Sequence, residues 1–367
     1  MVQMRMLDIL LKLLHLGLLT KEVSESDYIA LKKLDAAQWN IIYEMAISHR
    51  VAAIVYDGIQ RVFHAYGDPF VEVSDAKAIR RKWISIVDQI EKKNKNQIIT
   101  IKNMGSLWTK DGCKVLLMKG QANALLYPFP EHRTPGDIDC YLYDNYERGC
   151  ELAERVGAKV DVHWYKHAQI SIGGEMFENH KYFVTTRGGK KYRELNHELC
   201  VLLDNVSYDK FLETDIVLPP VMFNALFLTY HALAHFLSEG LRLRQIIDWA
   251  MFLKVHGSNI DWTQLYSLCD KYRFTTFMNI MNAIAIEDFG VVVHDSRIQV
   301  NQHLKQKVID SLLDDNYIYS SDRGPWSKRL SIINNLIKYR WKYKEIYNKN
   351  VFQQLFEYVI GFVLKSE

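Results

Sequence analysis

The spacing of hydrophobic residues changes twice along this chain of 367 residues, and that change constrains the fold most. Before about residue 110 and after about residue 191, hydrophobic residues recur every three or four positions, as on one face of an α-helix. Between them, the runs 114–118, 159–164 and 177–184 are short or alternating, as in β-strands. The pair Gly173-Gly174 predicts a hairpin turn. The pattern predicts an α+β fold, with a small mixed β-sheet flanked by N- and C-terminal helical regions.

We therefore divide the chain into a helical region over 1–110, an α/β core over 111–190 and a second helical region over 191–367. The net charge is only +3, which excludes a general attraction for nucleic acid or membranes. The five cysteines are scattered and form no CxxC pair, so neither a disulfide framework nor a cysteine zinc site is expected. No run approaches the roughly 20 apolar residues of a membrane span. We expect a cytoplasmic protein without a signal peptide.

A short segment of the core carries residues suited to phosphate chemistry. The apolar run that ends at Met118 is followed by Lys119-Gly120 and then by a helical pattern. Backbone N–H groups at the start of a helix attract phosphate oxygens, and Lys119 adds positive charge. Lys119 and Gly120 are therefore candidate phosphate ligands.

The next expected strand begins with Asp137-Ile138-Asp139. Because side chains alternate along a strand, Asp137 and Asp139 lie on one face and Ile138 points into the core. Two adjacent carboxylates repel each other unless a cation lies between them, and oxygen ligands of this kind suit Mg²⁺. Phosphoryl and nucleotidyl transfer use such an ion to orient the attacking and leaving oxygens. Asp137 and Asp139 are therefore candidate metal ligands.

The Lys-Gly turn, the helix and the motif Arg-x-x-Gly-Asp-Ile-Asp at 133–139 resemble the nucleotidyltransferase superfamily that includes DNA polymerase β. Within it, the chain is most similar to the bacterial uncharacterised nucleotidyltransferases, and it is similar in logic to the AbiEii-type toxin transferases. The resemblance implies that Lys119 and Gly120 hold a triphosphate and that Asp137 and Asp139 bind Mg²⁺ or Mn²⁺. It also implies that Arg133 contacts phosphate or substrate. The usual turn is Gly-Ser, whereas this chain has no serine there.

The resemblance further implies a third carboxylate on a neighbouring strand. Glu178 follows the expected hairpin and shares a strand face with His180, in a Glu-x-His pattern. Asp161, in the run Val-Asp-Val-His-Trp at 160–164, is the alternative. We favour Glu178, because its position after the hairpin fits better and a carboxylate within a strand is otherwise unfavourable. Glu178 would complete the catalytic and metal-binding group, and it could act as a base toward the attacking group.

These features predict an enzyme that transfers phosphorus-containing groups. It would move a nucleoside monophosphate from a nucleoside triphosphate such as ATP to RNA, protein or a small molecule, and would release pyrophosphate. The alternative is a non-catalytic nucleic-acid-binding or interaction protein that retains the fold. The segment Lys328–Lys349 interleaves basic and aromatic residues, as an RNA-binding helix does. The same pattern is typical of a surface helix with rings packed inward and lysines in solvent, which we favour.

Helical spacing groups further polar residues in the C-terminal region. His231, His235 and Glu239 are four residues apart, and such a stripe could bind zinc in a hydrolase. An alanine follows the first histidine, so the HExxH pattern is absent. We favour histidines on a helix that packs beside the sheet.

Two arginines follow this helix. Arg244 and Asp248 are four residues apart, which predicts an ion pair on a helix surface. A contact between the nucleotide and Arg242 or His235 is a further hypothesis.

Overall fold

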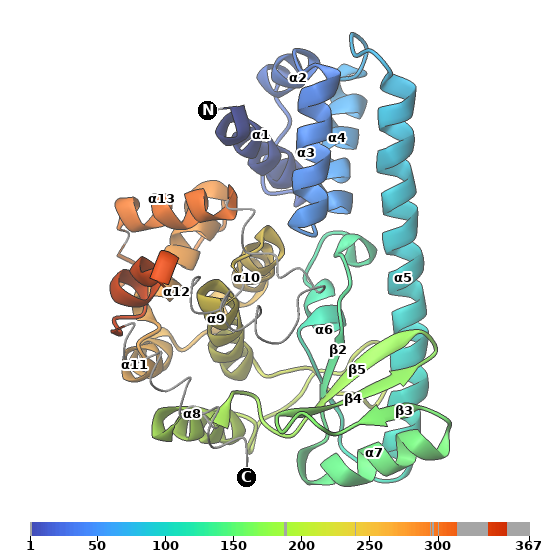
Figure 1. Cartoon of the computed structure of the whole chain (residues 1–367), viewed down its shortest axis with the longest axis vertical. Helices are drawn as coiled ribbons and strands as arrows, with labels where there is room; N and C mark the ends of the chain where they lie inside the picture. Colours follow the sequence, from blue (N-terminus) through green and yellow to red (C-terminus); the bar gives the residue numbers. More distant parts are fainter. Residues whose placement is uncertain are drawn as a thin grey trace.

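The computed structural model describes residues 2–186, 189–238, 240–293, 295, 297–299, 301–313 and 337–350. In this part of the chain, one five-stranded mixed sheet lies toward one end of an otherwise helical molecule (Figure 1). The predicted α+β fold is confirmed.

Four helices form the N-terminal bundle: α1 (Val2–Gly17), α2 (Glu25–Lys32), α3 (Ala36–Ser48) and α4 (Ala52–Tyr66). Ser24 and Asp35 begin α2 and α3 with capping boxes, in which the side chain accepts from the backbone N–H three residues later. The turn between α3 and α4 contains His49 and Arg50.

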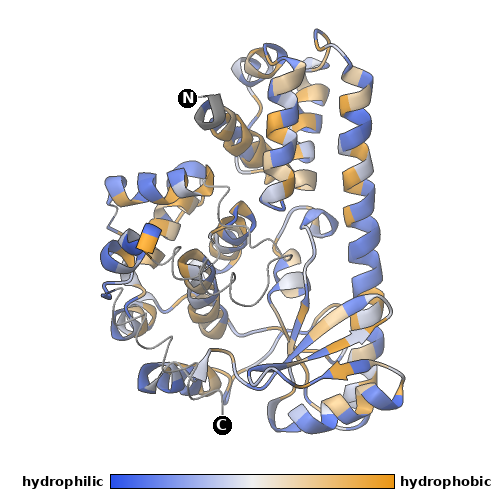
Figure 2. Cartoon of the chain, in the orientation of Figure 1, coloured by the Kyte–Doolittle hydropathy of each residue, from blue (hydrophilic) through white to orange (hydrophobic). Residues whose placement is uncertain are grey.

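Helix α5 (Ala76–Lys110) has 35 residues and is about 50 Å long, so it runs along most of the molecule (Figure 1). Its first half buries Trp83 and Ile90 against the N-terminal helices. Its last turns bury Met104 and Trp108 in a second core that lies beneath the sheet. The middle of the helix is hydrophilic (Figure 2). One helix therefore contributes to both hydrophobic cores.

The sheet has the strand order β1-β2-β5-β4-β3. Its strands are β1 (Leu116–Met118), β2 (Ile138–Tyr141), β3 (Lys159–Asp161), β4 (His167–Ile172) and β5 (Glu175–His180). Strands β2 and β5 are parallel, and the other neighbouring pairs are antiparallel. Strands β4 and β5 form a hairpin around Gly173-Gly174, as predicted. The short helix α6 (Gly120–Ala124) follows β1, and α7 (Tyr146–Arg155) precedes β3.

The C-terminal region is again helical. Its elements are α8 (Lys190–Val201), α9 (Val221–Ser238), α10 (Leu243–His256), α11 (Trp262–Tyr272), α12 (Thr275–Ala283), α13 (Gln302–Asp310) and the short π-helix η8 (Lys342–Ile346). Among the described helices, α9 alone is long and apolar enough to cross a membrane, but 61% of it is buried inside the fold. Burial of that kind is typical of the central helix of a protein core.

One hydrophobic cluster joins the N-terminal bundle, α9 and α10. The α3–α4 turn contacts the start of α10, where the backbone N–H of Leu243 donates to His49 Nδ1 over 3.4 Å. The backbone N–H of Arg244 donates to the carbonyl of His49 over the same distance. The two helical regions therefore contact each other through the α3–α4 turn and the start of α10.

The basic and aromatic segment is described over residues 337–350 only, and the rest of 328–349 lies outside the described residues. In the described part, Tyr339, Tyr343 and Tyr347 are buried, which agrees with rings that pack inward. Lys342 is also buried, and its ammonium donates to the carbonyl of Phe236 over 3.1 Å. This lysine is therefore not in solvent, contrary to the expectation for that segment.

Candidate active site

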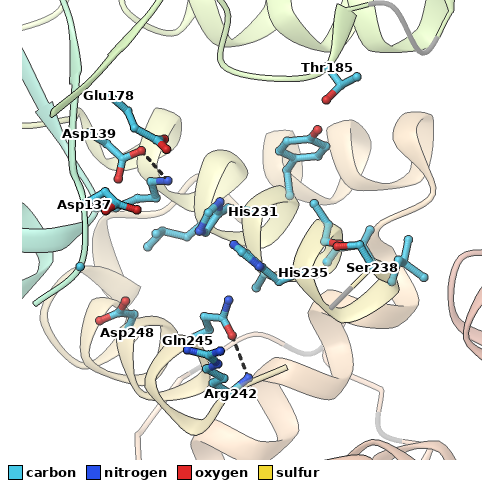
Figure 3. A pocket seen from close by; sticks show the side chains of 18 of the residues that line it. Asp137, Asp139, Glu178, Thr185, His231, His235, Ser238, Arg242, Gln245 and Asp248 are labelled. Carbon is cyan, nitrogen blue, oxygen red and sulfur yellow. Dashed lines mark hydrogen bonds and ion pairs between the residues drawn. The ribbon is translucent and has the colours of Figure 1, made fainter. Parts of the chain in front are cut away.

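A cavity of about 960 Å³ lies between the sheet and the helical regions. Asp137, Asp139 and Glu178 line its sheet side, and His231 and His235 reach into it from α9 (Figure 3). Residues of the α3–α4 turn and of the start of α10 also line it. The cavity therefore brings together residues from all three regions of the chain.

The three candidate carboxylates converge on one wall of this cavity (Figure 3). Asp137 directly precedes β2, Asp139 lies within β2, and Glu178 is the register partner of Asp139 on the parallel strand β5. Side chains opposite each other on adjacent strands share a face, so the sheet itself sets this arrangement. Burial and repulsion by Glu178 and Asp139 raise the pKa of Asp137. A bound dication would relieve this repulsion.

Asp139 is the most enclosed of the three. Lys119 Nζ lies 2.7 Å from its Oδ1, and His180 Nε2 lies 2.9 Å from the same atom. Burial alone would raise the pKa of Asp139, but Lys119 and His180 hold it well below its usual range. Asp139 is therefore ionised, and Lys119 neutralises it.

The turn at Lys119-Gly120 has an unusual backbone, because φ is +48° at Lys119 and +33° at Gly120. A Cβ atom on Gly120 would lie 3.5 Å from the carbonyl oxygen of Asp137, so the turn packs against the acidic residues. Lys119 is engaged with Asp139 in this arrangement. Its role, and that of Gly120, in holding a triphosphate stays a prediction.

Asp161 lies elsewhere. It is on β3, which is separated from β5 by β4. Its carboxylate pairs with His163 Nδ1 at 2.5 Å, in an exposed position, and it does not line the cavity. The structure therefore brings Glu178, and not Asp161, to Asp137 and Asp139.

A family model described as "uncharacterised nucleotidyltransferase" matches residues 35–290 of the chain. This region includes the whole sheet, the three carboxylates and the cavity-lining helices α9 and α10. The chain belongs to this nucleotidyltransferase family. Comparisons with curated proteins and with solved structures gave no match.

Two histidine side chains of the nucleotidyltransferase lie beside Glu178. One ligand atom each from His167, Glu178 and His180 lies within 4.8 Å of the others, so these residues could hold a metal ion. Imidazole nitrogen favours transition metals, whereas carboxylate oxygen suits Mg²⁺ or Mn²⁺. Sequence reasoning missed His167. The hairpin could have revealed it, because counting back from the Gly-Gly turn pairs His167 with His180.

Arg133 lines the cavity of this nucleotidyltransferase, and its predicted contact with phosphate or substrate stays a prediction. Its guanidinium is buried and donates to both oxygens of Asp248, over 2.7 and 2.8 Å. The hydroxyl of Tyr127 donates to the same carboxylate over 2.6 Å. The ion pair of Arg133 with Asp248 therefore connects the loop before β2 to α10.

The predicted surface ion pair between Arg244 and Asp248 is absent from the described residues, because Asp248 forms its buried ion pair with Arg133. Arg244 donates instead to the carbonyl of Thr134 over 3.1 Å.

A buried network of amide side chains also holds the loop that leads to Asp137. Gln97 on α5 donates to the carbonyl of Gly136 over 2.6 Å, and Asn94 donates to the carbonyl of Arg133 over 3.1 Å. Gln121 on α6 donates to both, over 2.6 Å to Asn94 Oδ1 and 3.0 Å to Gln97 Oε1. These residues position the first aspartate of the site.

The two histidines of α9 line the cavity, and Glu239, the third residue of the predicted stripe, lies outside the described residues. Their rings meet edge to face, with centroids 4.5 Å apart. Burial and the nearby Lys119 lower the pKa of His231 well below its usual value, so its ring is neutral. Helix α9 packs beside the sheet, as we favoured from the sequence.

Proposed function

We propose that this nucleotidyltransferase moves a nucleoside monophosphate from a nucleoside triphosphate to a hydroxyl of RNA, protein or a small molecule, and releases pyrophosphate. The observation that carries the proposal is the convergence of Asp137, Asp139 and Glu178 on one cavity wall. An ionised Asp139 and a Glu178 whose pKa is lowered, chiefly by its hydrogen bond with His180 against the effect of burial, are suitable metal ligands.

We propose that these carboxylates hold Mg²⁺ or Mn²⁺, with His167 and His180 beside them. Bound there, the ion would polarise phosphate oxygens and offset the charge that develops in the transition state. The carboxylate oxygens of Asp137, Asp139 and Glu178 fit such an ion.

In the proposed reaction, the acceptor hydroxyl oxygen forms a bond to the α-phosphorus. The bond from the α-phosphorus to the bridging oxygen of the β-phosphate breaks, and pyrophosphate leaves with those electrons. Glu178, an ionised carboxylate on the cavity wall, accepts the hydroxyl proton. Lys119, which neutralises Asp139, is the nearby cation that we assign to the triphosphate.

The test is transfer of label from each nucleoside triphosphate, labelled at the α-phosphate, to components of a cell extract, together with release of pyrophosphate. We expect activity with Mg²⁺ or Mn²⁺ and a loss of about 100-fold or more in Asp137→Asn, Asp139→Asn and Glu178→Gln. Asp161→Asn is the matched control, because Asp161 is an acidic strand residue outside the cavity, and it should retain activity. Equal losses in Asp161→Asn and Glu178→Gln would contradict the assignment. RNA binding without any nucleotide response would favour the non-catalytic alternative.

A further inference from the structure

Three arginines from the helical regions line the cavity. Arg50 comes from the α3–α4 turn, and Arg242 and Arg244 come from the start of α10. We call Arg50, Arg242 and Arg244 the arginine cluster. None of the three belongs to the motif that identifies the family's acidic site, so their presence here needs its own explanation.

The guanidinium groups of Arg50 and Arg244 converge on one point of the backbone. A Cβ atom built on Gly136 would lie 3.3 Å from Arg244 Nη1 and 3.8 Å from Arg50 Nη1. Gly136 directly precedes Asp137. Two cations held this close repel each other, and the cost is greater in a partly buried site than in water. An anion bound between the two guanidinium groups would attract both of them and would offset their mutual repulsion.

The protein supplies little negative charge to the cluster. The carboxylate of Asp248 is taken by Arg133 in a bidentate pair. Arg244 has a buried Nε with no hydrogen-bond partner in the described residues. The Arg50 side chain makes no hydrogen bond or ion pair with the part of the chain that the structure describes. Burial and the charge of Arg242 lower the pKa of Arg50, and Asp137 is the carboxylate whose charge opposes this shift. Burial, with Arg133 and Arg50 among the nearby charges, lowers the pKa of Arg244.

Two local features of the arginine cluster are unfavourable in themselves. Arg50 has a φ of +58°, in the left-handed region, where a residue with a Cβ atom is strained. Arg242 and Arg244 lie at the start of α10, and the first turn of that helix has no acidic residue. The N-terminal end of a helix carries partial positive charge, which disfavours arginines there and favours anions.

We propose that the arginine cluster binds the β- and γ-phosphates of the nucleoside triphosphate, and hence the pyrophosphate that leaves. The inference rests on the proposed function and deepens it, because it places the triphosphate between Asp137 and the helical regions. Arginine forms paired hydrogen bonds with phosphate oxygens, so three guanidinium groups suit a group with several negative charges. A phosphorylated acceptor offers the same oxygens, and the test separates the two sources.

The test measures binding of a nucleoside triphosphate, the corresponding monophosphate and pyrophosphate, each with Mn²⁺, by titration calorimetry. We expect Arg50→Gln and Arg244→Gln each to weaken binding of the triphosphate and pyrophosphate about 10- to 100-fold, the usual loss for a hydrogen bond to a charged group. Binding of the monophosphate should stay unchanged. Arg81→Gln, which removes an exposed arginine of α5, is the matched control and should change none of the three affinities.

Arg50→Gly provides a second readout. Glycine adopts positive φ without strain, so this variant should melt at a higher temperature than the wild type and yet bind the triphosphate more weakly. A variant that merely unfolds would show the opposite change in melting temperature.

Several results would overturn the inference. Unchanged affinity for the triphosphate and pyrophosphate in both glutamine variants is one. Loss of label transfer with normal triphosphate binding is another, because it would assign the cluster to the acceptor. An equal loss for the monophosphate would be a third. If the wild type transfers no label but binds pyrophosphate through Arg50 and Arg244, the proposed transferase function is wrong, whereas the phosphate-binding role of the arginine cluster is supported.

Discussion

Replacing Arg133 with methionine would leave the Asp248 carboxylate buried, with the hydroxyl of Tyr127 as its remaining donor among the bonds described. Arg133 is 3% exposed and Asp248 is 7% exposed, so the unpaired carboxylate would have little contact with water. Breaking one side of a buried ion pair typically costs about 3–5 kcal/mol. At roughly 2.1 cal/mol/K of unfolding entropy per residue, a chain of this length should melt about 4–6 °C lower.

The assay is urea unfolding followed by tryptophan fluorescence, together with the melting temperature. The double variant Arg133→Met/Asp248→Leu should recover much of the loss, because it removes the unpaired charge as well. Lys210→Met is the control, since Lys210 and Asp215 form an exposed pair and its loss should cost less than about 1 kcal/mol. A methionine variant with normal stability but weaker triphosphate binding would refute this reasoning and would return Arg133 to phosphate recognition.

Two further predictions concern the loop before β2. Gln97→Leu removes the hydrogen bond to Gly136, so turnover should fall about 10-fold or more through misplacement of the site. Gln89→Leu, on an exposed part of the same helix, should have no effect, and equal turnover in the two variants would contradict the prediction. Burial opposes charge on His132, but hydrogen bonding with Asp57 and a second carboxylate raises its pKa from 6.5 to about 9. The ion pair of His132 with Asp57 should add roughly 1–2 kcal/mol to the free energy of unfolding below pH 6.5, and this contribution should disappear as pH rises through 9. If the free energies of unfolding of the wild type and His132→Gln depend on pH in the same way across that range, the prediction is wrong.

The acidic residues could be found from the sequence because strand alternation is a local rule. Asp137 and Asp139 are two positions apart in one strand, and Glu178 follows a hairpin that a Gly-Gly pair marks. A motif fixes the position of a residue but not its partner. The motif around Arg133 predicted a contact with phosphate or substrate, but it could not indicate Asp248, the partner that lies 115 residues away along the chain.

The supporting residues were harder to foresee. Asn94 and Gln97 continue the buried face of α5 between Ile90 and Ile101, at helical spacing, yet their neighbours Lys92, Lys93 and Lys95 made that stretch resemble a solvated surface. Arg50 lies in a turn far from the motif, and only the packing of the two helical regions brings it to Gly136. Such contacts depend on tertiary structure and leave no periodic signal in the sequence.

The length of α5 has a consequence for what can fold alone. A fragment that begins at residue 111 would contain every strand, but it would leave the underside of the sheet without Met104 and Trp108. It would also lack Gln97, so the carbonyl of Gly136 would lose its donor from α5. The smallest piece able to arrange the acidic residues must therefore begin well before the first strand, and the helix that precedes the sheet in the chain is part of the sheet's own folding unit.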